Sequence, residues 1–160
     1  KKAIKVAGDV MDHDIQNYFR NTHRLEIGDR TAEQIKITVG SAMRSRSKNI
    51  LVKGRDLVSG IPKTIDVRSD EIRQALKDSV KRILEVVKDA LESTPPELSS
   101  DIIDRGILVA GGGAQLRGLD QVIREKTNVP CNVVEEPHLA IVKGCGKIIE
   151  DLEKYKHVLI

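Results

Sequence analysis

The sequence predicts an α/β fold in which a partly parallel sheet is flanked by helices and a small α+β subdomain is inserted. Three observations predict it. Strand-like and helix-like patterns alternate along the second half of the chain, and a basic segment with a different pattern interrupts the first half. The 160 residues are 39% hydrophobic and 32% charged, with no apolar run longer than four. That content supports a folded core, but no run is long enough for a membrane-spanning helix.

The first elements are a strand and a helix. Residues 1–7 (KKAIKVA) alternate in a strand-like way, and we expect the strand to end at Gly8. Met11 and Ile15 then recur at helical spacing, with Asp9 placed to cap the helix by accepting its first free N–H groups. The chain opens without a methionine and already in this pattern, so we interpret it as a piece of a longer protein.

Residues 21–68 form the predicted insert. A helix is expected from Thr31, because Ala32, Ile35 and Val39 mark one apolar face. Two strand-like runs follow, residues 50–52 and 65–67, joined by a loop through Gly54, Gly60 and Pro62. The segment 34–55 holds six basic residues and no acidic one. A solvated basic face is one interpretation, and contact with a membrane of anionic lipid or with an acidic partner is the other.

A long helix is expected after the insert. Ser69 is placed to cap it, and Pro95-Pro96 should end it. Its apolar positions follow steps of three and four, which predicts firm packing along one face. They are Ile72, Leu76, Val80, Ile83, Val87, Ala90 and Leu91.

The last third of the chain alternates helices and strands. A short helix over 97–104 leads into a buried strand at 107–110, followed by three glycines and a helix with Leu116, Leu119, Val122 and Ile123 inward. A strand at 131–134 and a helix over 138–156 complete the chain.

The glycine segment is the first candidate binding site. A strand that runs into Gly111, Gly112 and Gly113 and then into a helix lets the backbone approach a ligand closely, and it favours an anion. Two phosphate-binding patterns fail here. Leu119-Asp120 stands where a P-loop needs Lys-Ser/Thr, and Leu116 stands where the dinucleotide fingerprint needs its third glycine. A turn that only connects strand to helix remains the alternative.

The second candidate lies at the start of the helix in the insert. Glu33 and Lys36 are three residues apart and share a face, where a carboxylate could accept from ribose hydroxyls and a lysine stem could lie along a base. A surface ion pair is the alternative.

Other chemistries lack support. Asp12 and Asp14 point apart on a helix, and the two cysteines lack metal-ligand spacing, which also fits a reducing cytoplasm. Only three aromatic residues are present, which argues against a nucleic-acid surface built on stacking. No catalytic set is recognised.

With these segments identified, the chain resembles the MreB family of bacterial actin homologues, in the actin/Hsp70/sugar-kinase superfamily. The resemblance rests on four stretches in family order: residues 8–15, 28–36, 94–102 and 111–113. It covers essentially the whole chain and implies an actin-like (ribonuclease H-like) fold. Residues 1–20 and 69–160 would form subdomain IIA and residues 21–68 the inserted subdomain IIB.

The resemblance also implies roles for both candidate sites. Glu33, Gln34, Ile35 and Lys36 would line the adenosine side of an ATP/ADP cleft from IIB. Gly111, Gly112, Gly113 and Ala114 would form the facing loop of IIA, and Gly8 would approach the nucleotide.

The resemblance further implies what the parent protein does and what this chain lacks. The parent would be a cytoplasmic ATP-dependent filament protein that sets cell shape, and this chain would carry one assembly face. The phosphate loops and the magnesium-associated acid of the family have no counterpart in these 160 residues, so we expect no ATP hydrolysis by the chain alone. Rival functions are a small-molecule kinase, a chaperone-type ATPase and a non-nucleotide interaction module. Attachment to a membrane or an acidic partner would use the segment 34–55.

Overall fold

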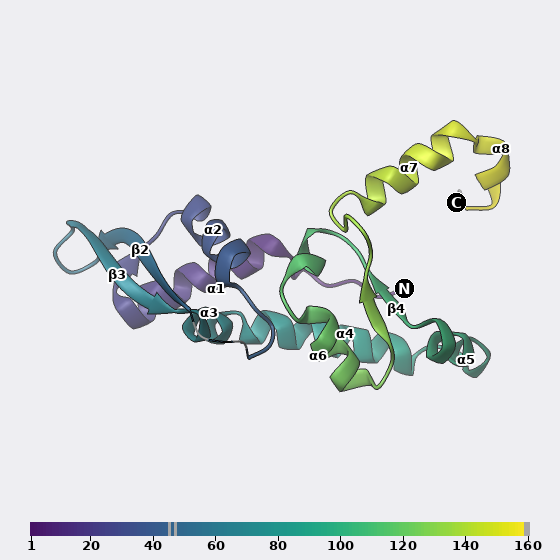
Figure 1. The fold of residues 1–160 in the computed structure, drawn as a ribbon, viewed down its shortest axis with the longest axis horizontal. Helices are drawn as coiled ribbons and strands as arrows, with labels where there is room; N and C mark the ends of the chain where they lie inside the picture. Colours follow the sequence, from purple (N-terminus) through teal and green to yellow (C-terminus); the bar gives the residue numbers. More distant parts are fainter. Residues whose placement is uncertain (45, 47, 159–160) are drawn as a thin grey trace.

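The computed structural model describes residues 1–44, 46 and 48–158. In Figure 1 the β2–β3 hairpin lies at one end of the molecule and the α7–α8 pair extends at the other. The helices and strands, in chain order, are α1 (Gly8–Tyr18), β1 (Leu25–Glu26), α2 (Asp29–Val39), β2 (Asn49–Asp56), β3 (Pro62–Arg68), α3 (Ser69–Ala75), α4 (Lys77–Glu92), α5 (Pro96–Arg105), β4 (Ile107–Val109), α6 (Leu119–Thr127), β5 (Cys131–Val133), α7 (Ala140–Glu150) and α8 (Leu152–Tyr155). A π-helical turn, Phe19–His23, follows α1, and 3₁₀ turns occupy Gly112–Gln115 and Lys156–Val158.

Two small sheets form. Strands β1, β2 and β3 pair antiparallel in that order, whereas β4 and β5 pair parallel, with Ile107 opposite Cys131. The predicted combination of a parallel pair with helices and a separate α+β segment is therefore present. The boundaries predicted for the subdomains, 1–20 with 69–160 and 21–68, remain a prediction, and Leu159 and Ile160 lie outside the described residues.

The core joins the first helices to the hairpin. Met11 and Ile15 of α1 are buried, as the helical spacing predicted, together with Ala32, Ile35 and Val39 of α2. On α3 and α4 the buried apolar positions are Ile72, Leu76 and Val80, and the stripe beyond them is only half-buried. Ser79 of α4 is also buried, and its hydroxyl donates to Asp14 Oδ2 at 2.5 Å.

The first strand prediction is wrong. Residues 1–7 form no strand, because a strand exists only through backbone pairing and none of the described residues pairs with this segment. The cap at Asp9 is also wrong. The helix begins at Gly8, with Ala7 in the extended cap position. Asp9 therefore lies in the first turn, where its negative charge interacts favourably with the helix dipole.

The hairpin and the second helix are longer than predicted. Helix α2 begins at Asp29 rather than Thr31. Gly54 lies inside β2 instead of in a loop. Glycine fits there because a Cβ would stand 2.5 Å from the Glu26 carbonyl oxygen of the neighbouring strand. The two-residue strand β1 was not predicted, because so short a run has no visible periodicity.

Both long helices are broken. The helix after the insert divides at Leu76 into α3 and α4, and Ser69 is its first residue rather than its cap. The Ser69 hydroxyl instead accepts from the Lys48 N–H at 3.0 Å and so joins the helix to the insert. The last helix divides at Asp151, whose φ of −144° and ψ of 72° are not helical.

The strand at 107–110 is not buried, contrary to its apolar composition. Ile107 and Val109 are half-buried against the core while Leu108 is 70% exposed, so the core covers one face of this strand.

Candidate functional site

A cavity of about 450 Å³ lies where the start of α1, helix α2 and the glycine loop meet. That volume is in the range of small-molecule sites. Its lining residues come from these three segments: Ala7, Gly8, Asp9, Met11, Glu33, Lys36, Ile37, Gly40, Gly112, Gly113, Gln115 and Leu116. The two segments singled out in the sequence, residues 33–36 and 111–114, therefore face one cavity.

Helix α2 directs its side chains by simple periodicity. Burial of Ala32, Ile35 and Val39 fixes the rotation of the helix. Glu33, Lys36 and Ile37, one turn apart, are thereby turned to the cavity. The exposed Ile37 supplies an apolar wall beside the charged groups.

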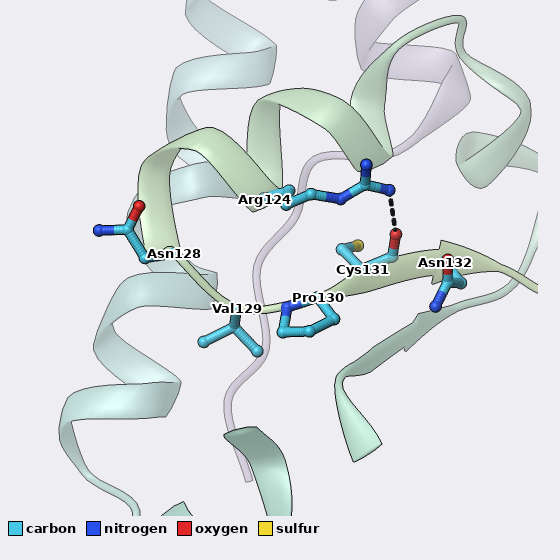
Figure 2. A pocket seen from close by; sticks show the side chains of 6 residues that line it. All are labelled: Arg124, Asn128, Val129, Pro130, Cys131 and Asn132. Carbon is cyan, nitrogen blue, oxygen red and sulfur yellow. Dashed lines mark hydrogen bonds between the residues drawn. The ribbon is translucent and has the colours of Figure 1, made fainter. Parts of the chain in front are cut away.

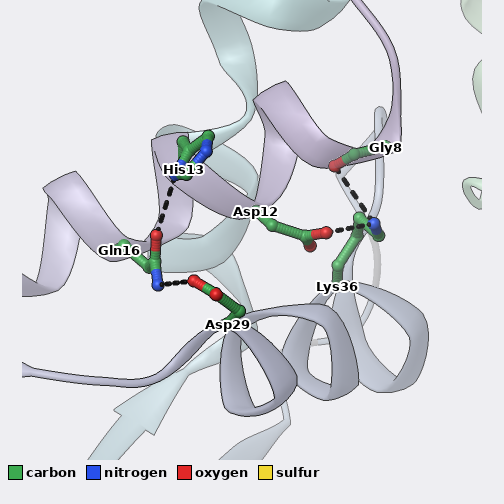
Figure 3. A network of polar contacts seen from close by, with 6 residues as sticks. All are labelled: Gly8, Asp12, His13, Gln16, Asp29 and Lys36. Atoms are coloured by element: carbon green, nitrogen blue, oxygen red, sulfur yellow. Dashed lines mark hydrogen bonds and ion pairs between the residues drawn. The ribbon is translucent and has the colours of Figure 1, made fainter.

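Lys36 is held by α1 rather than by Glu33. Its Nζ donates to Asp12 Oδ2 at 2.8 Å and to the Gly8 carbonyl oxygen at 3.1 Å (Figure 3). The side chains of Lys36 and Asp12 are only 16% and 15% exposed, so this ion pair is largely shielded from water. The ammonium is thus already neutralised, and the aliphatic stem is the part of Lys36 left for the cavity.

A second polar contact fixes the other end of α2. Gln16 Nε2 donates to Asp29 Oδ1 at 2.8 Å and to the Ile27 carbonyl oxygen at 3.2 Å, and His13 contacts the Gln16 amide oxygen at 3.0 Å (Figure 3). Helices α1 and α2 are therefore joined near both ends of α2.

The glycine loop contains two kinds of glycine. Gly111 has a φ of 88°, where a side chain is strained, and its N–H donates to the Pro137 carbonyl oxygen at 2.7 Å. Gly112 and Gly113 have no such requirement, and a Cβ built on either meets no atom of the chain within 4 Å. Their missing side chains leave open space at the cavity, as close approach of a ligand to the backbone would require.

The structure separates the predicted site residues into two groups. Glu33, Lys36, Gly112 and Gly113 line the cavity, and Gly8 joins them. The remaining four do not. Ile35 and Ala114 are buried, and Gln34 is exposed outside the cavity lining. Gly111 adopts the positive φ that the turn requires. Whether the first group binds a ligand remains a prediction.

Sequence reasoning missed several lining residues. Gln115 follows the glycine run directly and is a polar side chain that the pattern could have indicated. Ile37 and Gly40 extend the face of Glu33 and Lys36 along α2 and could have been found by continuing the helical period. Met11 and Leu116 reach the cavity only through tertiary packing.

A second cavity of about 500 Å³ lies between the end of α6 and β5, lined by Arg124, Asn128, Val129, Pro130, Cys131 and Asn132 (Figure 2). Arg124 Nη2 donates to the Cys131 carbonyl oxygen at 2.9 Å and lies 3.8 Å from Asp120 Oδ2. Burial raises the pKa of the Cys131 thiol, which favours the unreactive form. The charged group in this lining, Arg124, already has partners within the chain, and we therefore do not consider this cavity as the candidate site.

Within the described ranges, no three His, Cys, Asp or Glu side chains gather as a metal site would require. In the same part of the chain, no helix combines the length and apolar character needed to cross a membrane.

Comparisons with known proteins find relatives that match most of this chain. The Mbl cell shape-determining protein of Bacillus subtilis is 47% identical over 153 residues, and MreB of Escherichia coli is 40% identical over 154. These matches cover 95% and 96% of this chain but only 46% and 44% of the relatives. The chain therefore spans about half the length of the curated relatives it matches.

Solved structures show the same fold. The MreB5 protein of Spiroplasma citri bound to ADP matches with a TM-score of 0.91 and 34% identity, covering 98% of this chain and 48% of that one. The MamK double helical filament matches with a TM-score of 0.77 at 22% identity, over 92% of this chain and 46% of that one, and supports the actin-like fold alone. The family described as "MreB/Mbl protein" matches residues 1–157. The chain thus belongs to the MreB/Mbl family of actin-like proteins.

Proposed function

We propose that this chain forms the adenosine side of an ATP/ADP cleft in a filament-forming protein that sets or maintains cell shape. The observation that supports it most is the meeting of Glu33 and Lys36 with Gly112 and Gly113 at one cavity. The MreB5 structures of Spiroplasma citri bound to ADP and to AMPPNP add support, because both ligands are adenine nucleotides.

The residues divide the work of binding a nucleoside. The Glu33 carboxylate accepts hydrogen bonds from ribose hydroxyls. The stem of Lys36 and the side chain of Ile37 provide an apolar surface for the base, while Asp12 and Gly8 hold the Lys36 ammonium in place. Gly112 and Gly113 let the loop backbone approach the ligand.

This stretch of 160 residues binds ATP weakly and does not hydrolyse it by itself. Phosphoryl transfer depends on groups that position the phosphates and on magnesium. Asp9 and Glu33 are the acidic residues that line the cavity among the described residues. Within the same residues, no three acidic, histidine or cysteine side chains gather as a magnesium site of the chain itself would require. Magnesium would enter with the nucleotide phosphates and would stabilise their charge.

The proposal is tested by titrating a fluorescent ATP analogue with the purified chain and with Gly113→Val. The valine side chain enters open space, so the fold is retained while the ligand is excluded. Gly144→Val is the matched control, because a Cβ at Gly144 also meets nothing within 4 Å and the residue lies in α7, away from the cavity.

We expect Gly113→Val to weaken binding at least about tenfold, equivalent to ~1.4 kcal/mol, with Gly144→Val unchanged. Equal affinities for the two variants would contradict the site. Measurable ATP turnover by the chain, above that of Glu33→Gln, would contradict the proposed lack of hydrolysis.

Filament assembly belongs to the proposal for the whole protein. The chain carries one assembly face and does not extend a filament alone. Pelleting of the purified chain with ATP in a sedimentation assay would contradict this.

A further inference from the structure

A row of cations follows one face of α3 and α4. Arg73, Lys77 and Lys81 recur every four residues, and the backbone bonds from Leu76 N–H to the Ile72 carbonyl and from Val80 N–H to the Leu76 carbonyl keep the two helices in register. These three side chains and Lys126 of α6 line a cavity of about 240 Å³. None of the described residues that line it is acidic.

The charges in this row are poorly neutralised. Arg73 Nε lies 3.7 Å from Asp70 Oδ1, yet it is buried and has no hydrogen-bond partner among the described residues. Lys81 lies 3.6 Å from Glu85 in a well-exposed pair, which is worth little in water. Within the part of the chain described here, Lys77 and Lys126 make no ion pair. The cavity therefore keeps a net positive charge.

The floor of the same cavity is apolar. Ala42, Val80 and Leu84 form it, because they are buried or half-buried whereas the three lysines around them are exposed, and the buried Ser41 lies in the same lining. A simple phosphate site needs several donors converging on one point, whereas here cations surround an apolar surface. A ligand that fits both must combine several negative charges with an apolar group.

A second basic cavity continues the row. It also measures about 240 Å³ and is lined by Val39, Arg46, Lys48, Ser69 and Arg117. The two cavities adjoin. Ser41 Oγ donates to the Arg117 carbonyl oxygen at 3.2 Å, and Ser69 lies one helical turn before Arg73. Neither cavity shares a lining residue with the candidate nucleotide site.

We propose that the basic groove formed by these two adjoining cavities binds an extended acidic peptide of a partner protein, with an apolar side chain of the peptide on the apolar floor of the first cavity. Four residues of helix rise about 6 Å, which sets the spacing of Arg73, Lys77 and Lys81. Alternate residues of an extended strand share one face and lie about 6.6 Å apart, so two carboxylates with an apolar side chain between them, each at an alternate position, face the groove together at the spacing of the row. A membrane surface would contact the outer lysines but would not reach the floor.

The experiment measures binding of a fluorescein-labelled peptide, EDELEDE, to the purified chain by fluorescence anisotropy. The comparison peptide QNQLQNQ has the same shape without charge. The groove variant is Lys77→Gln/Lys81→Gln. Its matched control is Lys88→Gln/Lys147→Gln, which removes the same charge from exposed positions outside both cavities.

We expect the acidic peptide to bind and the amide peptide not to bind. The groove variant should lose affinity about tenfold, and the control less than about twofold, because two ion pairs of modest strength are removed only in the groove. Affinity should also fall as salt rises, since exposed charges are screened.

Two further measurements decide what occupies the groove. Vesicles of anionic phospholipid and inorganic phosphate are tested for competition with the peptide, and the molecular mass of the chain is measured by light scattering. Equal loss of peptide affinity in groove and control variants would overturn the proposal. So would binding of vesicles or phosphate, without the peptide, that depends on Lys77 and Lys81. Dimerisation that disappears in the groove variant would overturn it as well, by making a second copy the occupant.

Discussion

Replacing Lys36 with methionine should destabilise the protein far more than loss of an ordinary lysine. The change removes the ammonium and keeps most of the stem. Asp12 then loses the partner at 2.8 Å, and the Gly8 carbonyl loses the one at 3.1 Å. Asp12 Oδ1 is already buried without a hydrogen-bond partner among the described residues, so the variant leaves a shielded carboxylate with no compensation from Lys36.

The expected cost follows from burial. Removing one partner of a fully buried ion pair costs about 3–5 kcal/mol, and a charged hydrogen bond contributes about 1.5–3 kcal/mol. The pair here retains 15–16% exposure and is partly solvated. We therefore expect a loss of about 2–3 kcal/mol, or ~5–10 °C in melting temperature for a chain of this size.

The assay is urea unfolding of five proteins: the unmodified chain, Lys36→Met, Asp12→Leu, the double variant and Lys88→Met. Replacing both partners by apolar groups removes the stranded charge, so the double variant should recover to within about 1 kcal/mol of the unmodified chain. Lys88→Met is the control, because its exposed pair with Glu92 contributes less than about 0.5 kcal/mol. A double variant no more stable than Lys36→Met, or equal losses in Lys36→Met and Lys88→Met, would refute the reasoning.

Three other changes test separate parts of the structure. Gly54→Ala should cost about 1–3 kcal/mol of unfolding free energy in urea, because its Cβ would stand 2.5 Å from the Glu26 carbonyl oxygen, whereas the Cβ of Gly60→Ala meets no described atom within 4 Å and tests only the positive φ. Gly111→Ala should cost about 1–2 kcal/mol from its φ of 88°, with Gly112→Ala within about 1 kcal/mol of the unmodified chain, and equal losses would contradict the distinction. Burial alone would raise the pKa of Glu71, but hydrogen bonds from the Arg68 N–H, His23 and Tyr18 outweigh it and hold that pKa below its ordinary value. This contribution to stability is complete above the ordinary carboxyl pKa and is lost as pH falls through the lowered one, so melting temperature should fall less steeply below about pH 4.5 in Glu71→Gln than in the unmodified chain.

The sequence predicted best where one local rule decided the outcome. The period of Ala32, Ile35 and Val39 fixed the rotation of α2 and so the direction of Glu33 and Lys36. Gly112 and Gly113 were recognised because a strand that runs into consecutive glycines and then into a helix lets the backbone approach a ligand closely. Both signals depend on neighbours in sequence, whereas the expectation that the two segments face one cleft came only from the family resemblance.

Predictions failed where residues distant in the sequence determine a side chain's partner or its burial. The Asp12 partner of Lys36 lies 24 positions away, so spacing within α2 paired Lys36 with Glu33 instead. The apolar strand at Ile107 could be placed, but the exposure of Leu108 depends on what covers the sheet, which composition does not show. The break at Leu76 was hidden because its dihedral angles stay near the helical region and the apolar period continues across it.

The α7–α8 arm has no buried residue among those described and extends away from the core in Figure 1. Its loss of helicity should precede global melting and leave the main cooperative transition nearly untouched. A calorimetric unfolding enthalpy divided by all 160 residues would then underestimate the enthalpy per residue of the part that unfolds cooperatively. Trypsin should also cleave this end before it cleaves the core.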